Sequence, residues 1–175
     1  MKNIGKIFEK NFKDSIPKNI WCYKPPDAAQ AFNMDNTKLR FSAHSPCDYM
    51  LFNGRLLCFF ELKTFDGACS FERSKEEHGN IHHHQIVTLK KYSGYRNTVA
   101  GFILDFRKTG NTYFLGIKDF DVLTEKITKK SFNEKDIMNY CNPVEIEKQK
   151  LKVNYRYNIK KLLNDIEKGR TEYDD

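Results

Sequence analysis

The sequence predicts an α/β (α+β) protein, with a few β-strands and several helices in one domain over residues 1–175. Two observations favour strands. An Asn-Gly pair at 53–54 lies between two apolar runs, and two further runs, "TVAGFILDFR" and "TYFLGI", flank the segment "KTGN". A third observation favours helices, because apolar residues recur at helical spacing near both ends of the chain.

In the first half of the chain, apolar spacing predicts a helix over residues 2–14. Prolines and scattered polar residues then predict a loop, with a short strand at most, over residues 16–45. The Asn-Gly pair predicts a two-residue turn of type I′, which makes residues 47–64 a β-hairpin. Residues 64–80 show no period, and we expect a mobile loop there.

In the second half, a helix is predicted over residues 81–92, before an antiparallel pair formed by the two later apolar runs. Residues 118–140 have a helical pattern, and residues 150–157 alternate as a strand. Apolar residues from Ile159 to Ile166 predict a closing helix, and residues 170–175 a flexible tail.

The composition narrows the class of protein. Lys and Arg number 30 against 23 acidic residues, a net charge of +7, which makes nucleic acid the leading partner. No apolar run approaches the roughly 18 residues that span a bilayer, and no signal-peptide pattern is present. Five cysteines without a C-x-x-C argue against a disulfide framework and a zinc knuckle. We therefore expect reduced thiols and a cytoplasmic location.

The predicted hairpin sorts its side chains onto two faces. With a two-residue turn, three charged residues share the open end of one face, namely Asp48, Glu61 and Lys63. The opposite face is apolar from end to end and is expected in the core; it carries Cys47, Tyr49, Leu51, Leu56, Cys58, Phe60 and Leu62.

The charged end of the hairpin suggests a metal site. The register makes Asp48 and Glu61 diagonal neighbours, roughly 7 to 8 Å apart at the backbone, so both carboxylates could reach one ion. Mg²⁺ takes oxygen ligands, and the carbonyl of Leu62 could add another. Lys63 could orient the attacking water or offset charge on a phosphate. The alternative is a pair of solvated acids at a strand end, with Lys63 in an ordinary ion pair.

Two more polar residues are candidates for supporting roles. Gln85 interrupts the apolar stripe of the helix over residues 81–92, and a buried amide needs a partner such as the attacking water or a DNA phosphate. It could instead be capped or partly exposed. The triplet His82 to His84 cannot grip one ion, since adjacent helical residues point about 100° apart, but one or two of these rings could contact phosphate or the core. Glu9 could be a surface acid only.

The sequence lacks the motifs of several other enzyme classes. The sequence has no Gly-rich phosphate loop, no H-E-x-x-H and no nucleophile elbow, which argues against NTPase, zincin and serine hydrolase functions. Cysteine and histidine are both present, but nothing in the pattern places them together.

Taken together, "CDY", "FELK", "GNIHHHQ" and "AGFILDF" resemble the RecU family of Holliday junction resolvases, within the PD-(D/E)XK nuclease superfamily. The resemblance runs from "GKIFE" to "NYRYNIKKLLNDI". It implies a restriction-endonuclease-like fold, with a central mixed β-sheet flanked by helices. It also implies a homodimer that cuts opposing strands of a four-way junction with Mg²⁺ or Mn²⁺.

The resemblance also implies roles for individual residues. Asp48 and Glu61 match the metal-binding acids, and Leu62 the residue whose carbonyl completes the metal site. Lys63 matches the catalytic lysine, and Gln85 falls on the H-Q helix position. Glu9 matches the acid of the Gly-x-x-x-Glu helix start, and with Gln85 it is expected to orient water or metal ligands. The segment between the first helix and Asp48 looks shorter than the family's, so we expect residues 16–45 to form a loop or a reduced stalk, without the family's basic N-terminal leader.

We therefore expect a metal-dependent, structure-specific endodeoxyribonuclease that resolves DNA junctions in recombination, repair or phage DNA processing, in a bacterial or phage-infected cell. The alternatives are a non-catalytic DNA-binding module of the same fold, or a restriction or repair nuclease on linear duplex. Basic candidates for the DNA backbone are Lys24, Arg40, Arg55, Arg73 and Lys75.

Overall fold

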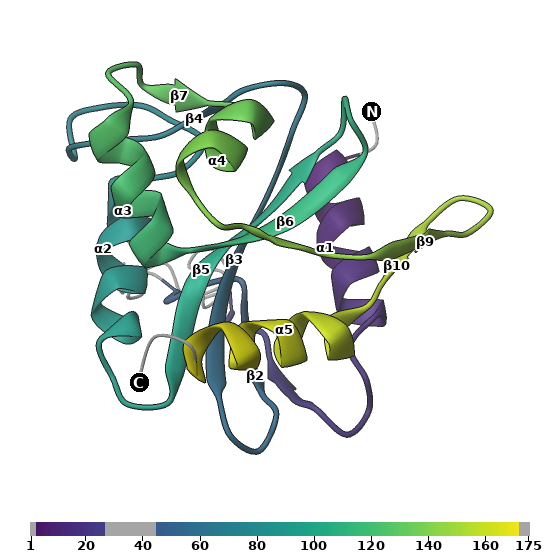
Figure 1. Cartoon of the computed structure of the whole chain (residues 1–175). Helices are drawn as coiled ribbons and strands as arrows, with labels where there is room; N and C mark the ends of the chain where they lie inside the picture. Colours follow the sequence, from purple (N-terminus) through teal and green to yellow (C-terminus); the bar gives the residue numbers. More distant parts are fainter. Residues whose placement is uncertain (1–2, 27–44, 172–175) are drawn as a thin grey trace, which may run out of the picture.

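The computed structural model describes residues 3–26 and 45–171, in which a six-stranded sheet carries helices on both faces (Figure 1). The elements are, in chain order, α1 (Ile4–Asp14), β1 (Trp21–Tyr23), β2 (Tyr49–Phe52), β3 (Leu57–Phe65), β4 (Cys69–Ser70), α2 (His83–Ser93), β5 (Thr98–Phe106), β6 (Asn111–Gly116), α3 (Ile117–Lys126), β7 (Ser131–Phe132), α4 (Glu134–Tyr140), β8 (Val144–Glu145), β9 (Lys148–Lys150), β10 (Tyr155–Tyr157) and α5 (Ile159–Thr171).

The central sheet is mixed, in the order β1-β2-β3-β5-β6-β8. Strands β3 and β5 are parallel, and the other neighbouring pairs are antiparallel. A parallel pair needs a crossover, and the chain makes it through α2. The predicted fold class, a mixed β-sheet flanked by helices, is confirmed.

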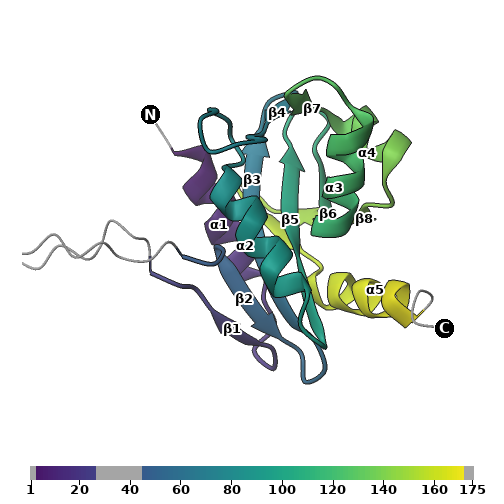
Figure 2. The same cartoon turned by 90° about the vertical axis from the view of Figure 1, so that its left-hand side faces the viewer.

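Two apolar clusters hold the helices against the sheet. Side chains of α2, α3 and α4, such as Leu89 and Phe120, pack with Phe102 on one face. Side chains of α1 and α5, such as Phe12 and Leu162, pack on the other. Figure 2 shows α2 and α3 in front of the strands. The alternation of side chains along each strand thus divides one sheet between two cores.

The hairpin of β2 and β3 has the predicted faces but a different register. Leu51 pairs with Cys58, because the connecting loop has four residues where a two-residue turn was predicted. Asn53 makes this loop: its Oδ1 accepts the backbone N–H groups of Arg55 and Leu56, at 3.0 and 2.8 Å. Gly54 has a positive φ of 97° but Asn53 does not, so the turn is not type I′.

The change of register alters the position of Asp48. The pairing moves by two residues, and an even shift leaves each side chain of the two strands on its predicted face. Continuing the observed register beyond Tyr49 and Phe60 places Asp48 directly opposite Glu61, where a diagonal position was predicted. Cys47 differs from the prediction, because it packs in the cluster on the α2 side of the sheet.

Two later predictions are wrong in detail. The helix predicted over residues 118–140 is broken, because α3 ends at Lys126 and Asn133 caps a new helix, α4, by accepting the N–H of Asp136. The strand predicted over residues 150–157 is one arm and the turn of the β9–β10 hairpin. The loop predicted after β3 contains the short strand β4, which pairs with β7.

Predictions about residues 27–44, which include most of the expected loop or stalk and Arg40, lie outside the described residues. So do residues 172–175 of the expected tail. All five cysteines are described, and each carries a free thiol. Across 3–26 and 45–171, every helix is too short or too polar to traverse a bilayer.

Candidate active site

The predicted acidic pair lies where β3 runs past the end of β2. Beyond Phe60, none of the described residues forms a strand along this edge of β3, and the backbone N–H of Leu62 donates to Asp48 Oδ2 at 2.8 Å. In an extended strand the N–H and C=O of one residue point to the same side. The carbonyl oxygen of Leu62 therefore lies on the edge that faces Asp48.

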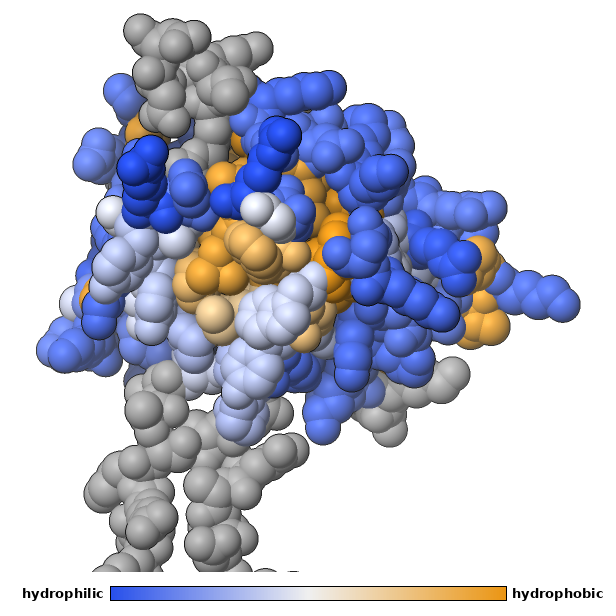
Figure 3. Space-filling view, turned by 90° about the horizontal axis from the view of Figure 1, so that it is seen from below, coloured by the Kyte–Doolittle hydropathy of each residue, from blue (hydrophilic) through white to orange (hydrophobic). Residues whose placement is uncertain are grey.

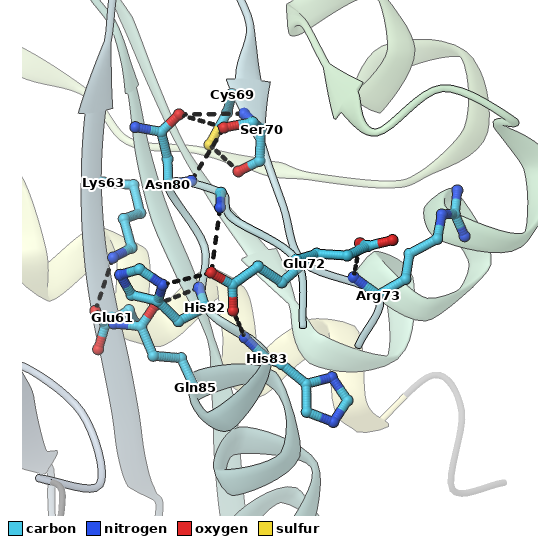
Figure 4. Close-up of polar contacts among 12 residues, drawn as sticks. Glu61, Lys63, Cys69, Ser70, Glu72, Arg73, Asn80, His82, His83 and Gln85 are labelled. Carbon is cyan, nitrogen blue, oxygen red and sulfur yellow. Dashed lines mark hydrogen bonds and ion pairs between the residues drawn. The ribbon is translucent and has the colours of Figure 1, made fainter. Parts of the chain in front are cut away.

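Glu61 is held from two sides. Its side chain is buried at 5% exposure, on the sheet face covered by α2. Lys63 Nζ lies 3.2 Å from Glu61 Oε1, and Gln85 Nε2, from the first turn of α2, donates a hydrogen bond to the same oxygen (Figure 4). The structure thus brings four of the predicted residues together, from the residue before β2, from β3 and from α2: Asp48, Glu61, Lys63 and Gln85.

Burial and mutual repulsion disfavour the ionised form of both carboxylates. Burial raises the pKa of Asp48 to about 7, and the charge of Glu61 adds to the rise. Burial also raises the pKa of Glu61 above its usual range, although Lys63 opposes that shift. The hydrogen bond from Leu62 works in the same opposing direction on Asp48. A bound cation would offset the repulsion between the two carboxylates, so the site favours a cation.

Glu9 lies at the margin of this group. Its negative charge helps to raise the pKa of both Asp48 and Glu61, which places α1 beside the site. Lys24 Nζ forms an ion pair with Glu9 Oε2 at 2.6 Å, and Tyr49 Oη donates to the Glu9 backbone carbonyl at 3.3 Å. Glu9 is therefore a partly neutralised neighbour of the pair, tied to β2 through Tyr49.

Glu72, which was not among the predicted site residues, anchors the first turn of α2. Glu72 accepts the backbone N–H of His83 at 2.7 Å, and His82 Nδ1 lies 2.7 Å from its Oε1 (Figure 4). These hydrogen bonds lower the pKa of Glu72 to about 2. The backbone N–H of His82 in turn donates to Gln85 Oε1 at 2.9 Å. A chain of contacts thus connects Glu72 to Gln85 and so to Glu61.

The only sequence signal for Glu72 is its context. It follows Phe71 in a stretch with apolar residues at Cys69, Phe71 and Ile81, all of which the structure buries; Glu72 is itself only 6% exposed, and a buried acid needs partners. The histidine triplet, in contrast, consists of a residue type that often binds metals. Its members act here through the backbone N–H groups of His82 and His83 and through one ring on a carboxylate.

The donor set of the acidic pair fits a hard divalent cation. Two carboxylates and a backbone carbonyl are oxygen ligands, and Mg²⁺ commonly takes one or two protein carboxylates together with water and phosphate oxygens. Within the described ranges, no group of three or more His, Cys, Asp or Glu side chains is arranged to hold a metal ion. A cation at Asp48 and Glu61 would therefore depend on backbone, solvent or substrate oxygens for its remaining ligands.

The basic residues predicted to bind DNA are dispersed. Lys24 lies beside the site through Glu9, whereas Arg55 is exposed on the hairpin loop and pairs with Glu167 at 2.7 Å. Arg73 donates to the backbone carbonyls of Thr124 and Ile127 and thereby binds the C-terminal end of α3. The remaining described candidate, Lys75, is exposed.

Comparison with known proteins gives a family match and similar individual proteins. The sequence model of the RecU family, described as recombination protein U, matches residues 10–161. The chain is 27% identical over 190 aligned residues to the SPbeta prophage-derived uncharacterized protein YotM of Bacillus subtilis (strain 168), covering 98% of this chain and 91% of that protein. Among solved structures, Hjc, a Holliday junction resolvase from Archaeoglobus fulgidus, matches with a TM-score of 0.43 and 12% identity, covering 73% of this chain and 83% of the other.

Proposed function

We propose that this chain, which belongs to the RecU family of recombination proteins, is a divalent-metal-dependent endodeoxyribonuclease that cuts four-way DNA junctions. The observation that carries the proposal is the pair formed by half-buried Asp48 and buried Glu61, whose carboxylates both have a raised pKa beside Lys63. The family match spans all three residues.

In this proposal Asp48 and Glu61 hold Mg²⁺ or Mn²⁺, with the carbonyl of Leu62 as a further ligand. The ion, when bound, supplies Lewis acidity and an activated water for phosphodiester hydrolysis. Lys63 stabilises the negative charge that develops on the phosphate, since its ammonium group lies next to Glu61 at 3.2 Å. Gln85 fixes the Glu61 carboxylate by its hydrogen bond, and Glu9 positions Lys24 near the substrate.

A junction is the preferred substrate in this proposal, and the working unit is a homodimer. Paired incision of opposing strands needs two sites, whereas the described part of the chain carries one such acidic pair. Exposed apolar side chains support association: Trp21 and Phe52 face each other across β1 and β2 at 52% and 42% exposure. Figure 3 shows hydrophobic residues gathered on the face seen from below, where the β2–β3 hairpin ends.

We propose a bacterial or phage setting for this activity. The similarity to a prophage-derived protein of Bacillus subtilis supports that setting.

The decisive experiment compares cleavage of a four-way junction, a fork and a linear duplex of the same sequence, with and without Mg²⁺. We expect symmetric nicks in the junction and little cutting of the duplex. Asp48→Asn is the catalytic control, and we expect it to bind junctions but to lose cleavage. Light scattering of the same preparation gives the oligomeric state, for which we expect a dimer.

The alternatives predict different outcomes. A non-catalytic DNA-binding module would bind junctions equally well after Mg²⁺ removal and would cut none of the three substrates. A restriction or repair nuclease would cut the linear duplex at least as fast as the junction, and a requirement for a palindromic site would favour restriction. Either result would replace the junction-cutting proposal.

A further inference from the structure

The β9–β10 hairpin projects beyond α1 at the right of Figure 1, away from the central sheet. Its two strands are antiparallel, with Tyr155 opposite Lys150, and they form a separate two-stranded sheet. Residues 151–154 make the tip, which is closed by a hydrogen bond from the Leu151 N–H to the Asn154 carbonyl at 2.8 Å. The hairpin is thus a narrow ribbon with a free end.

The base of the ribbon is firmly anchored. Lys148 Nζ lies 3.1 Å from Asp105 Oδ1 and 2.7 Å from Thr112 Oγ1, with only 12% of its side chain exposed. Tyr157 is 3% exposed in the cluster under α1, and its backbone N–H donates to Ser15 Oγ at 2.9 Å. These contacts fix the direction of the ribbon, so its tip is held in a defined position at the surface.

The charges on the ribbon all have one sign. From Lys148 to Asn158 the sequence contains no Asp or Glu. Lys150, Lys152 and Arg156 are exposed, and within the described residues none of the three forms an ion pair or a side-chain hydrogen bond. Their positive charge is therefore available to a polyanion.

The tip also exposes apolar side chains between those cations. Val153 is 81% exposed, Leu151 39% and Tyr155 37%. The right-hand edge of Figure 3, where the hairpin lies in Figure 1, shows hydrophobic residues set among hydrophilic ones. Apolar side chains flanked by lysines suit a groove of DNA, where they meet sugars and base edges while the ammonium groups reach phosphates.

We propose that the β9–β10 hairpin is a DNA-binding arm that contacts the duplex of the substrate away from the candidate active site. This inference rests on the proposed function, because it takes branched DNA as the substrate of that site. A two-stranded ribbon fits the major groove, which is about 12 Å wide. The three unpaired cations and the absence of acids favour the DNA backbone over a protein partner.

The test measures binding of the full-length chain to a four-way junction in EDTA, across a series of salt concentrations. The arm variant replaces three cations, Lys150→Gln, Lys152→Gln and Arg156→Gln. The matched control removes three exposed lysines from α3 and α4, which lie at the other side of the molecule in Figure 1: Lys118→Gln, Lys126→Gln and Lys135→Gln. Both variants have the same net charge, so a difference between them reports position.

We expect the arm variant to reduce the slope of log affinity against log salt by about 2.7, since each phosphate contact contributes about 0.9. The ratio of wild-type affinity to arm-variant affinity for the junction then falls about 40-fold between 50 and 200 mM salt. The control should keep the wild-type slope. Equal slopes for the arm variant and the control would refute the proposal that the hairpin binds DNA, but would not affect the proposed nuclease activity. A wild-type chain that binds no DNA would overturn both proposals.

Discussion

Replacing Gln85 by alanine tests whether α2 positions the acidic pair. The substitution removes the hydrogen bond to Glu61 and the helix cap on the His82 N–H. A hydrogen bond to a charged group contributes about 1.5–3 kcal/mol, and a helix cap about 1 kcal/mol. Because Lys63 still contacts the Glu61 carboxylate, we take the low end for that hydrogen bond and expect the free energy of unfolding to fall by about 2.5 kcal/mol.

Gln85→Ala should also slow cleavage in a protein that remains folded. Loss of a residue that orients a metal-binding carboxylate typically costs about 10- to 100-fold in activity, which corresponds to about 1.4–2.7 kcal/mol in the barrier. We expect junction cleavage by Gln85→Ala to slow by this factor at saturating substrate, with junction binding in EDTA unchanged. Urea unfolding followed by circular dichroism confirms that the variant is folded at the assay temperature.

A control that loses stability away from the acidic pair separates positioning from general destabilisation. Asn133→Ala removes the N-cap of α4, whose Oδ1 accepts the Asp136 N–H at 3.1 Å, and should cost about 1 kcal/mol. This residue makes no contact with Glu61, so cleavage by Asn133→Ala should remain at the wild-type rate. If both variants lost cleavage to the same extent, or if Gln85→Ala cut at the wild-type rate, Gln85 would not position Glu61.

Other substitutions test the surrounding structure. Glu72→Gln should lower the melting temperature at neutral pH. Because the pKa of Glu72 is lowered to about 2, its charge stabilises the fold above pH 4.5, and this stabilisation fades as the pH falls towards 2. A difference in melting temperature between variant and wild type that stayed constant from pH 6 to pH 3 would contradict this reasoning. Lys148→Met should cost about 3 kcal/mol in urea unfolding by leaving Asp105 with a buried charge, and adding Asp105→Asn should recover most of it. Gly101→Ala should destabilise by about 3 kcal/mol because its methyl group would collide with a backbone carbonyl of β6, whereas Gly169→Ala, with open space around it, should raise stability slightly in the same assay.

The hairpin illustrates what the sequence could predict. Alternation decided which side chains of β2 and β3 are buried, and that result survives an error of two residues in register. The turn type did not follow from the Asn-Gly pair, because the side chain of Asn53 satisfies two backbone N–H groups and so stabilises a longer loop. The grouping of Asp48 with Glu61 was thus predictable, while their direct opposition required the observed pairing.

The contacts around Glu61 were harder to predict because they join distant segments. Gln85 was identified as a polar residue on an apolar stripe, but its partner lies 24 residues earlier in the chain. Glu72 carries no motif, and its role depends on the loop after β4 folding back onto the first turn of α2. In the 118–140 segment, the helical pattern continued across the break, which is set by the cap at Asn133.

The carboxylate most central to the proposed chemistry is fastened to the opening turn of α2, and the ends of helices are where unfolding begins. Heating should therefore stop cleavage once this turn frays, even if the sheet itself is still folded. Deuterium uptake at the amides of His82 and His83 would report that event, and the temperature at which it accelerates should coincide with the onset of inactivation.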